Sequence, residues 1–247
     1  MLGLPEDIIA CLFDLDGVVT DTAAVHAAAW KEMFDGFLRE HCARTGEGFV
    51  PFDIHDDYDN YVDGMSRADG VRSFLRSRNI GLPEGHPGDP PGEATIYGLG
   101  NRKNEIVLAR IHRDGVRVFE GSVAYLEAVG KAGLRRAVVS SSANTLDVLT
   151  VTGLLDCFEV RIDGLVALER NLKGKPAPDT YLAAAESLRV EPSRCAVFED
   201  AIAGVEAGRA GGFGWVVGVD RVGQAAALAS HGAHRVVEDL EELLVNP

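Results

Sequence analysis

Residues 8–17 read IIACLFDLDG, an apolar run that ends in two carboxylates, Asp14 and Asp16, placed two residues apart. Side chains alternate along a β-strand, so both carboxylates point to the same side if the strand continues through them. Gly17 lets the chain turn away and leaves both at the C-terminal end of the strand. Such a pair suits phosphoryl transfer, because one carboxylate attacks while the other moves a proton. The D-x-D-G pattern also occurs in calcium loops and surface turns, but the apolar strand before it favours the chemical interpretation.

Apolar runs further along the chain predict a sheet. Together with the first, they lie near residues 8–13, 136–140, 158–162, 194–198 and 214–219. Helical patterns separate them, and this alternation is typical of an α/β fold with a doubly wound parallel sheet. The interval between the first two strands is far longer than a crossover helix requires, so we expect an inserted α-helical cap domain there. We predict a Rossmann-like catalytic core domain from residues 1–21 and 115–247, and a cap domain over residues 22–114.

Three later segments supply other parts of a phosphoryl-transfer site. Residues 140–145 read SSSANT, a strand end where hydroxyls and backbone N–H groups can hold a phosphate, or where a hydroxyl simply caps a helix. Lys175 lies at a predicted helix start fixed by two prolines, where a lysine can neutralise a phosphate. Glu199 and Asp200 end another strand-like run. Acids at two strand ends of one sheet can share Mg²⁺, which prefers oxygen ligands.

These four signals, in this order, resemble the haloacid dehalogenase superfamily of aspartate-nucleophile phosphatases and mutases, and the match covers nearly the whole chain. Further patterns resemble its β-phosphoglucomutase-like subfamily. They are D-T-x-x-x-H-x-x-x-W over residues 21–30, G-x-S-R over residues 64–67, R-K-N over residues 102–104 and S-x-S-x-N over residues 140–144. Each is short, but their joint occurrence in this order is specific.

The resemblance implies roles for the acidic residues. Asp14 is implied to be the nucleophile that becomes phosphorylated, and Asp16 the general acid and base. The resemblance also implies a Mg²⁺ cofactor, held by the Asp14 carboxylate, the Asp16 backbone carbonyl and Asp200. Glu199 is expected close to the metal or linked to it through water.

The same resemblance implies the phosphate and sugar contacts. The transferring phosphoryl group is expected to be held by Ser140, the Ser141 backbone and Lys175. The second phosphate of the substrate is expected to contact Arg67, Ser142 and Asn144. His26 and Lys103 are expected to position the sugar and to couple cap closure to Asp16. Trp30 is a further candidate for substrate binding, although its place on the apolar face of a helix favours a core role.

The activity implied by the resemblance is that of a β-phosphoglucomutase, which converts β-glucose 1-phosphate to glucose 6-phosphate through glucose 1,6-bisphosphate. A Mg²⁺-dependent phosphatase of a sugar phosphate or similar small metabolite is the alternative, and the core residues do not distinguish the two. The G-x-S-R and R-K-N patterns favour the mutase. A non-catalytic binding domain is disfavoured, because the implied nucleophile, acid/base, lysine and metal ligand are all present. Ala143 and Gly70 depart from the family pattern, which often has lysine and serine there, and both departures concern sugar specificity.

The amino-acid composition indicates which kinds of partner the protein can bind and where it is located. The formal net charge of −14 argues against nucleic acid, whose phosphates an acidic protein repels. We expect a small-molecule sugar phosphate as the substrate and a monomer as the working form. The four scattered cysteines form no C-x-x-C pair and indicate a reducing compartment. The sequence has neither an export signal nor an apolar stretch long enough for a membrane span, so we expect a cytoplasmic protein without membrane contact.

Two segments of the insert lie outside these motifs. Residues 81–100 hold most of the Gly/Pro clustering, and we interpret them as a long loop of the cap. Residues 53–63 carry several aspartates and His55, but their spacing does not fit a calcium-binding loop. We expect a solvated helix face there.

Overall fold

The computed structural model describes residues 2–244, which form two compact units. The first, here called the core unit, contains the chain up to Asp21 and from Val116 onward. The second, here called the helical unit, is the continuous segment Thr22–Gly115.

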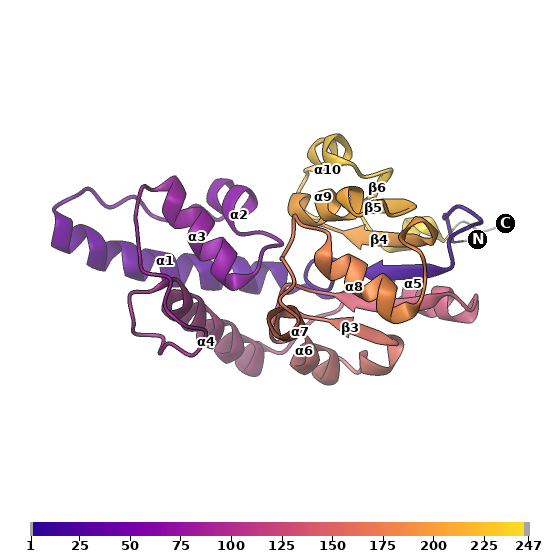
Figure 1. Ribbon diagram of the computed structural model, residues 1–247, viewed down its shortest axis with the longest axis horizontal. Coiled ribbons are helices and arrows are strands. Elements are labelled where there is room, and N and C mark those ends of the chain that lie inside the picture. The colour runs from indigo at the N-terminus through magenta and orange to yellow at the C-terminus, as the bar shows by residue number, and fades with distance from the viewer. Residues whose placement is uncertain (1, 245–247) are drawn as a thin grey trace. The chain divides into compact units, whose positions relative to one another are not determined.

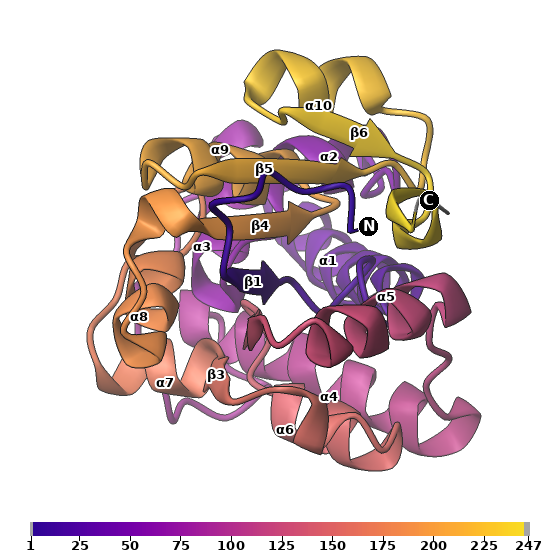
Figure 2. The same ribbon diagram turned by 90° about the vertical axis from the view of Figure 1, so that its right-hand side faces the viewer.

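The core unit is built on one parallel sheet of six strands (Figures 1 and 2). The strands are β1 Ala10–Phe13, β2 Arg135–Val139, β3 Val160–Ile162, β4 Cys195–Glu199, β5 Trp215–Val219 and β6 Arg235–Val237. Their order across the sheet is β3-β2-β1-β4-β5-β6, and every neighbouring pair is parallel. The predicted doubly wound parallel sheet is therefore confirmed. The chain winds in opposite directions on the two sides of the β1/β4 boundary, which makes that boundary the switch point where ligands bind in such sheets.

Both faces of the sheet are covered, which explains why its strands are continuous apolar runs. The helices of the core unit are α5 Glu120–Lys131, α6 Thr145–Val151, α7 Gly164–Glu169, α8 Asp179–Leu188, α9 Ile202–Ala210 and α10 Ala225–His231. Short 3₁₀ turns occur at Leu155–Cys157, Pro192–Arg194 and Leu240–Leu243. Leu12 joins the cluster formed with α8 and α9. The next residue, Phe13, contacts Tyr125 of α5 on the opposite face, with ring centroids 6.3 Å apart.

The sequence predicted five of the six strands and missed β6. This strand has three residues and lies at the edge of the sheet, where it pairs with β5 alone. A run of this length carries no alternation that distinguishes it from a loop. His234, the residue just before β6, accepts a hydrogen bond on its ring from the Val216 N–H at 3.0 Å.

The helical unit packs around a core of aromatic side chains. Its helices are α1 Ala23–Thr45, α2 Asp56–Tyr61, α3 Arg67–Ser77 and α4 Ile96–Asp114. Phe34 of α1 lies at the centre, 4.1 Å from the Phe74 ring and 5.2 Å from the Trp30 ring between centroids. The predicted helical insert is thus present.

Two segments of the helical unit refine the sequence interpretation. The expected loop over residues 81–100 ends at Thr95, whose hydroxyl accepts from the Gly98 N–H and starts α4, so its last five residues are helical. The aspartate-rich segment forms the short helix α2, and Asp53 accepts from the backbone N–H groups of His55 and Asp56 at its start. In the described part of the chain, no helix is both long and apolar enough to cross a membrane.

Candidate active site

Asp14 and Asp16 lie at the carboxyl end of β1, on a tight turn. The Asp14 N–H continues the sheet by donating to Phe198 O at 3.0 Å. Gly17 has a φ of +86° and donates to Thr20 O at 2.8 Å, so the chain reverses immediately after Asp16. A side chain at Gly17 would collide with the Asp200 carboxylate. The glycine therefore turns the chain and leaves room for the acid from β4.

Lys175 links the ends of three neighbouring strands. Its Nζ lies 2.5 Å from Asp14 Oδ1 and 2.5 Å from Glu199 Oε1, and it donates to Val139 O at 3.1 Å. The side chains of Lys175 and Glu199 are 1% and 0% exposed. One buried cation thus lies between two buried carboxylates, directly beside the predicted nucleophile.

The electrostatic balance at this cluster follows from burial and pairing. Burial lowers the pKa of the Lys175 ammonium group, but Asp14 and Glu199 outweigh it and hold the pKa above its usual range. Burial raises the pKa of the Asp14 carboxyl group, and Lys175 opposes this rise. The pKa of Asp14 stays well above its usual value, because burial and the nearby Glu199 and Asp16 carboxylates outweigh the lysine. Lys175 is the neighbour that favours the ionised form, which is the form that can attack phosphorus.

Lys175 lies outside the helix in which it was expected. Helix α8 begins at Asp179, and the lysine belongs to the preceding loop, where its peptide bond to Pro176 is cis. Pro178 occupies the position just before the helix. The prolines therefore shape the loop and the entry to α8, while the ammonium group is fixed by its buried acidic partners.

The serine-rich loop follows β2 and brings Ser140 to the first turn. Ser140 Oγ lies 3.3 Å from Asp16 Oδ2, and its N–H donates to Ile162 O at 3.0 Å. Its hydroxyl also accepts from the Ser142 N–H at 3.0 Å, and the Ser142 hydroxyl accepts from the Asn144 N–H at 3.2 Å. Helix α6 begins at the next residue, Thr145. The loop thus places a hydroxyl beside Asp16 at a helix entrance.

One group of side chains within residues 2–244 gathers closely enough to hold a metal ion. It consists of Asp14, Glu199 and Asp200, each of which contributes one carboxylate oxygen to a group whose members lie within 4.8 Å of one another. All three residues are buried. Lys175 brings a single positive charge to these three carboxylates, and carboxylate oxygens are ligands for hard divalent ions. The donor set therefore fits a divalent metal.

In the helical unit, His26, Trp30 and Lys103 lie together. The Lys103 Nζ is 2.9 Å from His26 Nδ1 and 4.9 Å from the centroid of the Trp30 ring. Trp30 and Lys103 are buried, and Trp30 belongs to the hydrophobic core of this unit. A Cβ at Gly70 would lie 3.1 Å from the Trp30 ring, which gives a steric reason for glycine where the family often has serine.

Arg67 lies on α3, one helical turn before Gly70. It is the first residue of α3, after Ser66, whose hydroxyl accepts from the Asp69 N–H at 3.3 Å and donates to the Asp69 carboxylate. Its half-buried guanidinium group reaches Asn101 Oδ1 at 3.4 Å. Burial lowers the pKa of this group.

A family model of haloacid dehalogenase-like hydrolases matches residues 8–212. The chain belongs to this family. It is 59% identical to a β-phosphoglucomutase of Mycobacterium bovis over 247 residues, which cover 99% of this chain and 94% of the relative. It is 30% identical to a β-phosphoglucomutase of Bacillus subtilis, covering 95% and 91% of the two chains. The crystal structure of a β-phosphoglucomutase from Clostridium difficile superposes with a TM-score of 0.74 at 26% identity, covering 96% of this chain and 93% of that one.

Tyr181 is a buried member of this site that the sequence interpretation missed. Its hydroxyl donates to Glu199 Oε1 at 2.6 Å, and its ring centroid lies 5.1 Å from Lys175 Nζ. Burial and the nearby Glu199 raise the pKa of the Tyr181 hydroxyl well above its usual value, so it stays a hydrogen-bond donor. The sequence feature that could have pointed to Tyr181 is its position at the start of the helix that follows the lysine loop.

The loop after β5 supports both acidic turns and was also missed. Arg221 Nε donates to Gly17 O at 2.9 Å, and its guanidinium carbon lies 3.6 Å from the centroid of the Phe119 ring. Gln224 Nε2 donates to Asp200 O at 3.0 Å. One loop therefore holds the backbone beside Asp16 and the backbone that carries Asp200.

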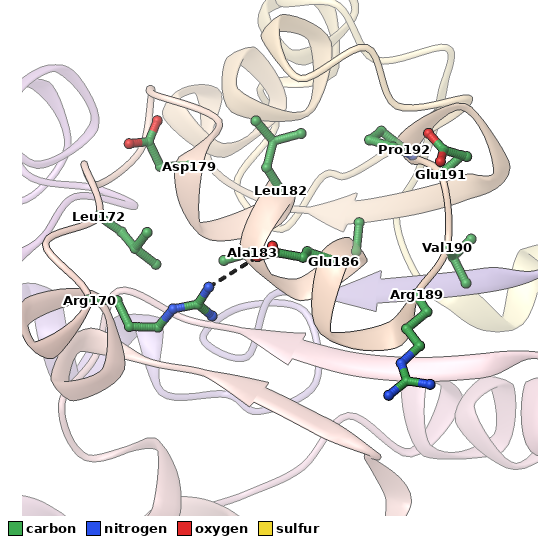
Figure 3. Close-up of a pocket in the computed structure, with 11 residues that line it drawn as sticks. Arg170, Leu172, Asp179, Leu182, Ala183, Glu186, Arg189, Val190, Glu191 and Pro192 are labelled. Atoms are coloured by element: carbon green, nitrogen blue, oxygen red, sulfur yellow. Dashed lines mark hydrogen bonds and ion pairs between the residues drawn. The ribbon is translucent and has the colours of Figure 1, made fainter.

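A groove of about 730 Å³ runs along α8 (Figure 3). Arg170 and Glu186 pair across it at 3.1 Å, and Leu182 lines it from the helix. None of the residues predicted for the chemistry lines this groove. The candidate active site is therefore the cluster at the carboxyl ends of β1, β2 and β4.

Proposed function

We propose that this chain is a β-phosphoglucomutase that converts β-glucose 1-phosphate to glucose 6-phosphate. The observation that carries the proposal is Asp14 at the end of β1, in contact with Lys175 and followed by Asp16 beside Ser140. The 59% identity to a relative of this name, over nearly the whole of both chains, supports the same activity. The substrate is then a small sugar phosphate, and the working form is proposed to be a monomer.

The reaction consists of two transfers at Asp14. Phospho-Asp14 gives its phosphoryl group to the 6-hydroxyl of β-glucose 1-phosphate, while Asp16 accepts the hydroxyl proton. The product is glucose 1,6-bisphosphate. After it reorients, the Asp14 carboxylate attacks the phosphorus at C1, the bond to the sugar oxygen breaks, and Asp16 returns the proton to that oxygen. Glucose 6-phosphate leaves, and phospho-Asp14 is restored.

Residues around Asp14 stabilise the charge that moves during each transfer. Lys175 lies beside Asp14 and neutralises negative charge on the phosphoryl oxygens. The Ser140 hydroxyl and the Ser141 backbone are proposed to hold the same group. We propose Mg²⁺ as the cofactor, held by Asp14, the Asp16 backbone carbonyl and Asp200, with Glu199 nearby. A bound Mg²⁺ reduces the repulsion between the carboxylate and the phosphate.

We propose that the core unit is the catalytic domain, predicted as residues 1–21 and 115–247, and that the helical unit is the cap, predicted as residues 22–114. Gly115 belongs to the helical unit, one residue beyond the predicted boundary. In the helical unit, Arg67 is proposed to bind the phosphate that is not being transferred. His26 and Lys103 are proposed to contact the sugar. The Lys103 ammonium group also lies over the ring of the buried Trp30. In the core unit, Ser142 and Asn144 are proposed to bind the second phosphate.

The products of one incubation test the proposal. The wild-type protein is supplied with β-glucose 1-phosphate, Mg²⁺ and a catalytic amount of glucose 1,6-bisphosphate. Glucose 6-phosphate and free phosphate are then measured together. A mutase produces glucose 6-phosphate in large excess over phosphate. Release of phosphate without glucose 6-phosphate would favour the simple phosphatase.

A further inference from the structure

Two arginines of α3 have opposite surroundings. Arg72 pairs with the carboxylates of Asp69 and Glu84. Arg67, five positions earlier on the same helix, has no carboxylate partner within residues 2–244, and its guanidinium group contacts the neutral side chain of Asn101. Its charge is therefore not neutralised by the described fold.

The orientation of the Asn101 amide is fixed by a loop. Its Nδ2 donates to Pro87 O and to Asp89 O, both at 2.9 Å. An amide nitrogen has two N–H donors, and both are used here. The amide oxygen, Oδ1, therefore has to face the other way, where Arg67 Nη1 lies at 3.4 Å.

The loop that holds Asn101 is itself well fixed. Asp89 Oδ2 accepts from the His86 N–H at 3.1 Å and from the Thr95 hydroxyl at 2.7 Å. Gly85 has a φ of +73°, and the space beside it is filled by Asp89 and Thr95. The Ile96 N–H donates to Pro83 O at 3.0 Å and closes the loop. Residues 83–95 thus form an ordered support in spite of their Gly/Pro-rich composition.

We propose that the loop over residues 83–95 acts through Asn101 as a neutral support that orients Arg67 for the second phosphate of a sugar bisphosphate. Asn101 is a positioning residue, and the inference rests on the proposed role of Arg67. A carboxylate at this position would orient the guanidinium group but would also compete with the phosphate for it. An amide orients the group and leaves its positive charge to the ligand.

The test is the concentration of glucose 1,6-bisphosphate that gives half-maximal mutase activity, measured together with kcat. The variants are Asn101→Ala, Asn101→Asp, Arg67→Ala and the double variant Arg67→Ala with Asn101→Ala. Asn60→Ala is the matched control, because Asn60 also donates its amide to a backbone carbonyl in the helical unit, that of Asp56 at 2.7 Å. Thermal unfolding of each variant shows that it is folded.

We expect Asn101→Ala to raise the half-maximal concentration of glucose 1,6-bisphosphate by about three- to tenfold, because the variant loses one ordinary hydrogen bond. Its kcat should change by less than about twofold. Asn101→Asp should raise the half-maximal concentration further, because the new carboxylate pairs with Arg67. The double variant should match Arg67→Ala alone, since Asn101 acts through that residue. Asn60→Ala should behave as wild type.

Two results would overturn the inference, and they are distinguishable. If Arg67→Ala raises the concentration but both Asn101 variants match Asn60→Ala, the support by Asn101 is wrong and the role of Arg67 stands. If Arg67→Ala itself has no effect on the bisphosphate, the proposed role of Arg67 is wrong, and the inference that rests on it falls as well.

Discussion

Lys175 in the core unit and Arg67 in the helical unit are both proposed to contact phosphate, yet they are held in opposite ways. Lys175 is fully buried between Asp14 and Glu199, at 2.5 Å from each. Arg67 is half-buried beside the neutral amide of Asn101. A fully buried charge needs an opposite charge in the fold, whereas a half-buried one can be satisfied by water or by a ligand.

This difference separates two tasks. Lys175 pairs with both the proposed nucleophile, Asp14, and Glu199, so its charge contributes to the stability of the fold as well as to the proposed reaction. Arg67 keeps a charge that the described fold does not neutralise, so that charge is available for the substrate. Removal of Lys175 should therefore affect both folding and every phosphoryl transfer, while removal of Arg67 should affect only substrates that carry a second phosphate.

Asp14→Asn is expected to have the largest effect and to abolish turnover. It removes the nucleophile with almost no change in volume, and Lys175 retains Glu199 as a partner, so the protein should stay folded. Turnover and thermal unfolding are measured on the same preparation. Residual turnover beyond contamination would reject Asp14 as the nucleophile.

Lys175→Met is expected to destabilise the fold by about 3–5 kcal/mol, because two buried carboxylates lose their cation. Chemical denaturation measures this free energy of unfolding. The matched control is Lys173→Met, which removes an exposed lysine two positions earlier. Arg67→Met should cost about 1 kcal/mol or less, since it removes one hydrogen bond to a neutral group. Equal losses for Lys175 and Arg67 would contradict the contrast between them.

Asp16→Asn is expected to lower the rate by roughly 10²–10⁴, the usual contribution of a positioned general acid or base. Asp21→Asn is the control, because Asp21 lies on the same segment and pairs with the exposed Arg117. Steady-state rates with β-glucose 1-phosphate measure the effect. An Asp16→Asn enzyme as active as wild type would show that the proton is moved by another group.

Asp200→Ala should raise the Mg²⁺ concentration needed for half-maximal activity, because it removes one of three carboxylates that gather for the metal. A Mg²⁺ titration of wild type and variant measures the shift. If the wild-type protein kept full activity in excess chelator, the reaction would not require a metal ion.

Much of the core unit could be predicted from the sequence because its strands are buried on both faces and therefore read as apolar runs. The acids at the carboxyl ends of β1 and β4 meet because these strands are parallel neighbours, with Phe13 opposite Phe198. The short edge strand β6 gave no such signal. Tyr181 and Arg221 were missed because their contacts join distant parts of the chain. Arg221 and Gly17, for example, are 204 positions apart.

In the helical unit, the sequence located the patterns but not what surrounds them. The R-K-N and G-x-S-R patterns pointed to Lys103 and Arg67. Nothing in the sequence indicated that a glycine- and proline-rich loop would fix Asn101 beside Arg67, because those hydrogen bonds end on backbone carbonyls, which no side-chain pattern encodes. The close approach of the Trp30 ring to Gly70 likewise depends on packing alone.

The most direct test of the two roles is to measure Arg67→Ala with two substrates. Mutase flux from β-glucose 1-phosphate should fall by roughly one to two powers of ten, the cost of losing a charge-assisted contact to phosphate. The rate of hydrolysis of a small aryl phosphate should change little, because this substrate has no second phosphate for Arg67 to bind. Arg76→Ala, an exposed arginine of the same helix, is the control and should change neither rate. An equal loss with both substrates would contradict the account, because Arg67 would then support the helical unit and not a second phosphate.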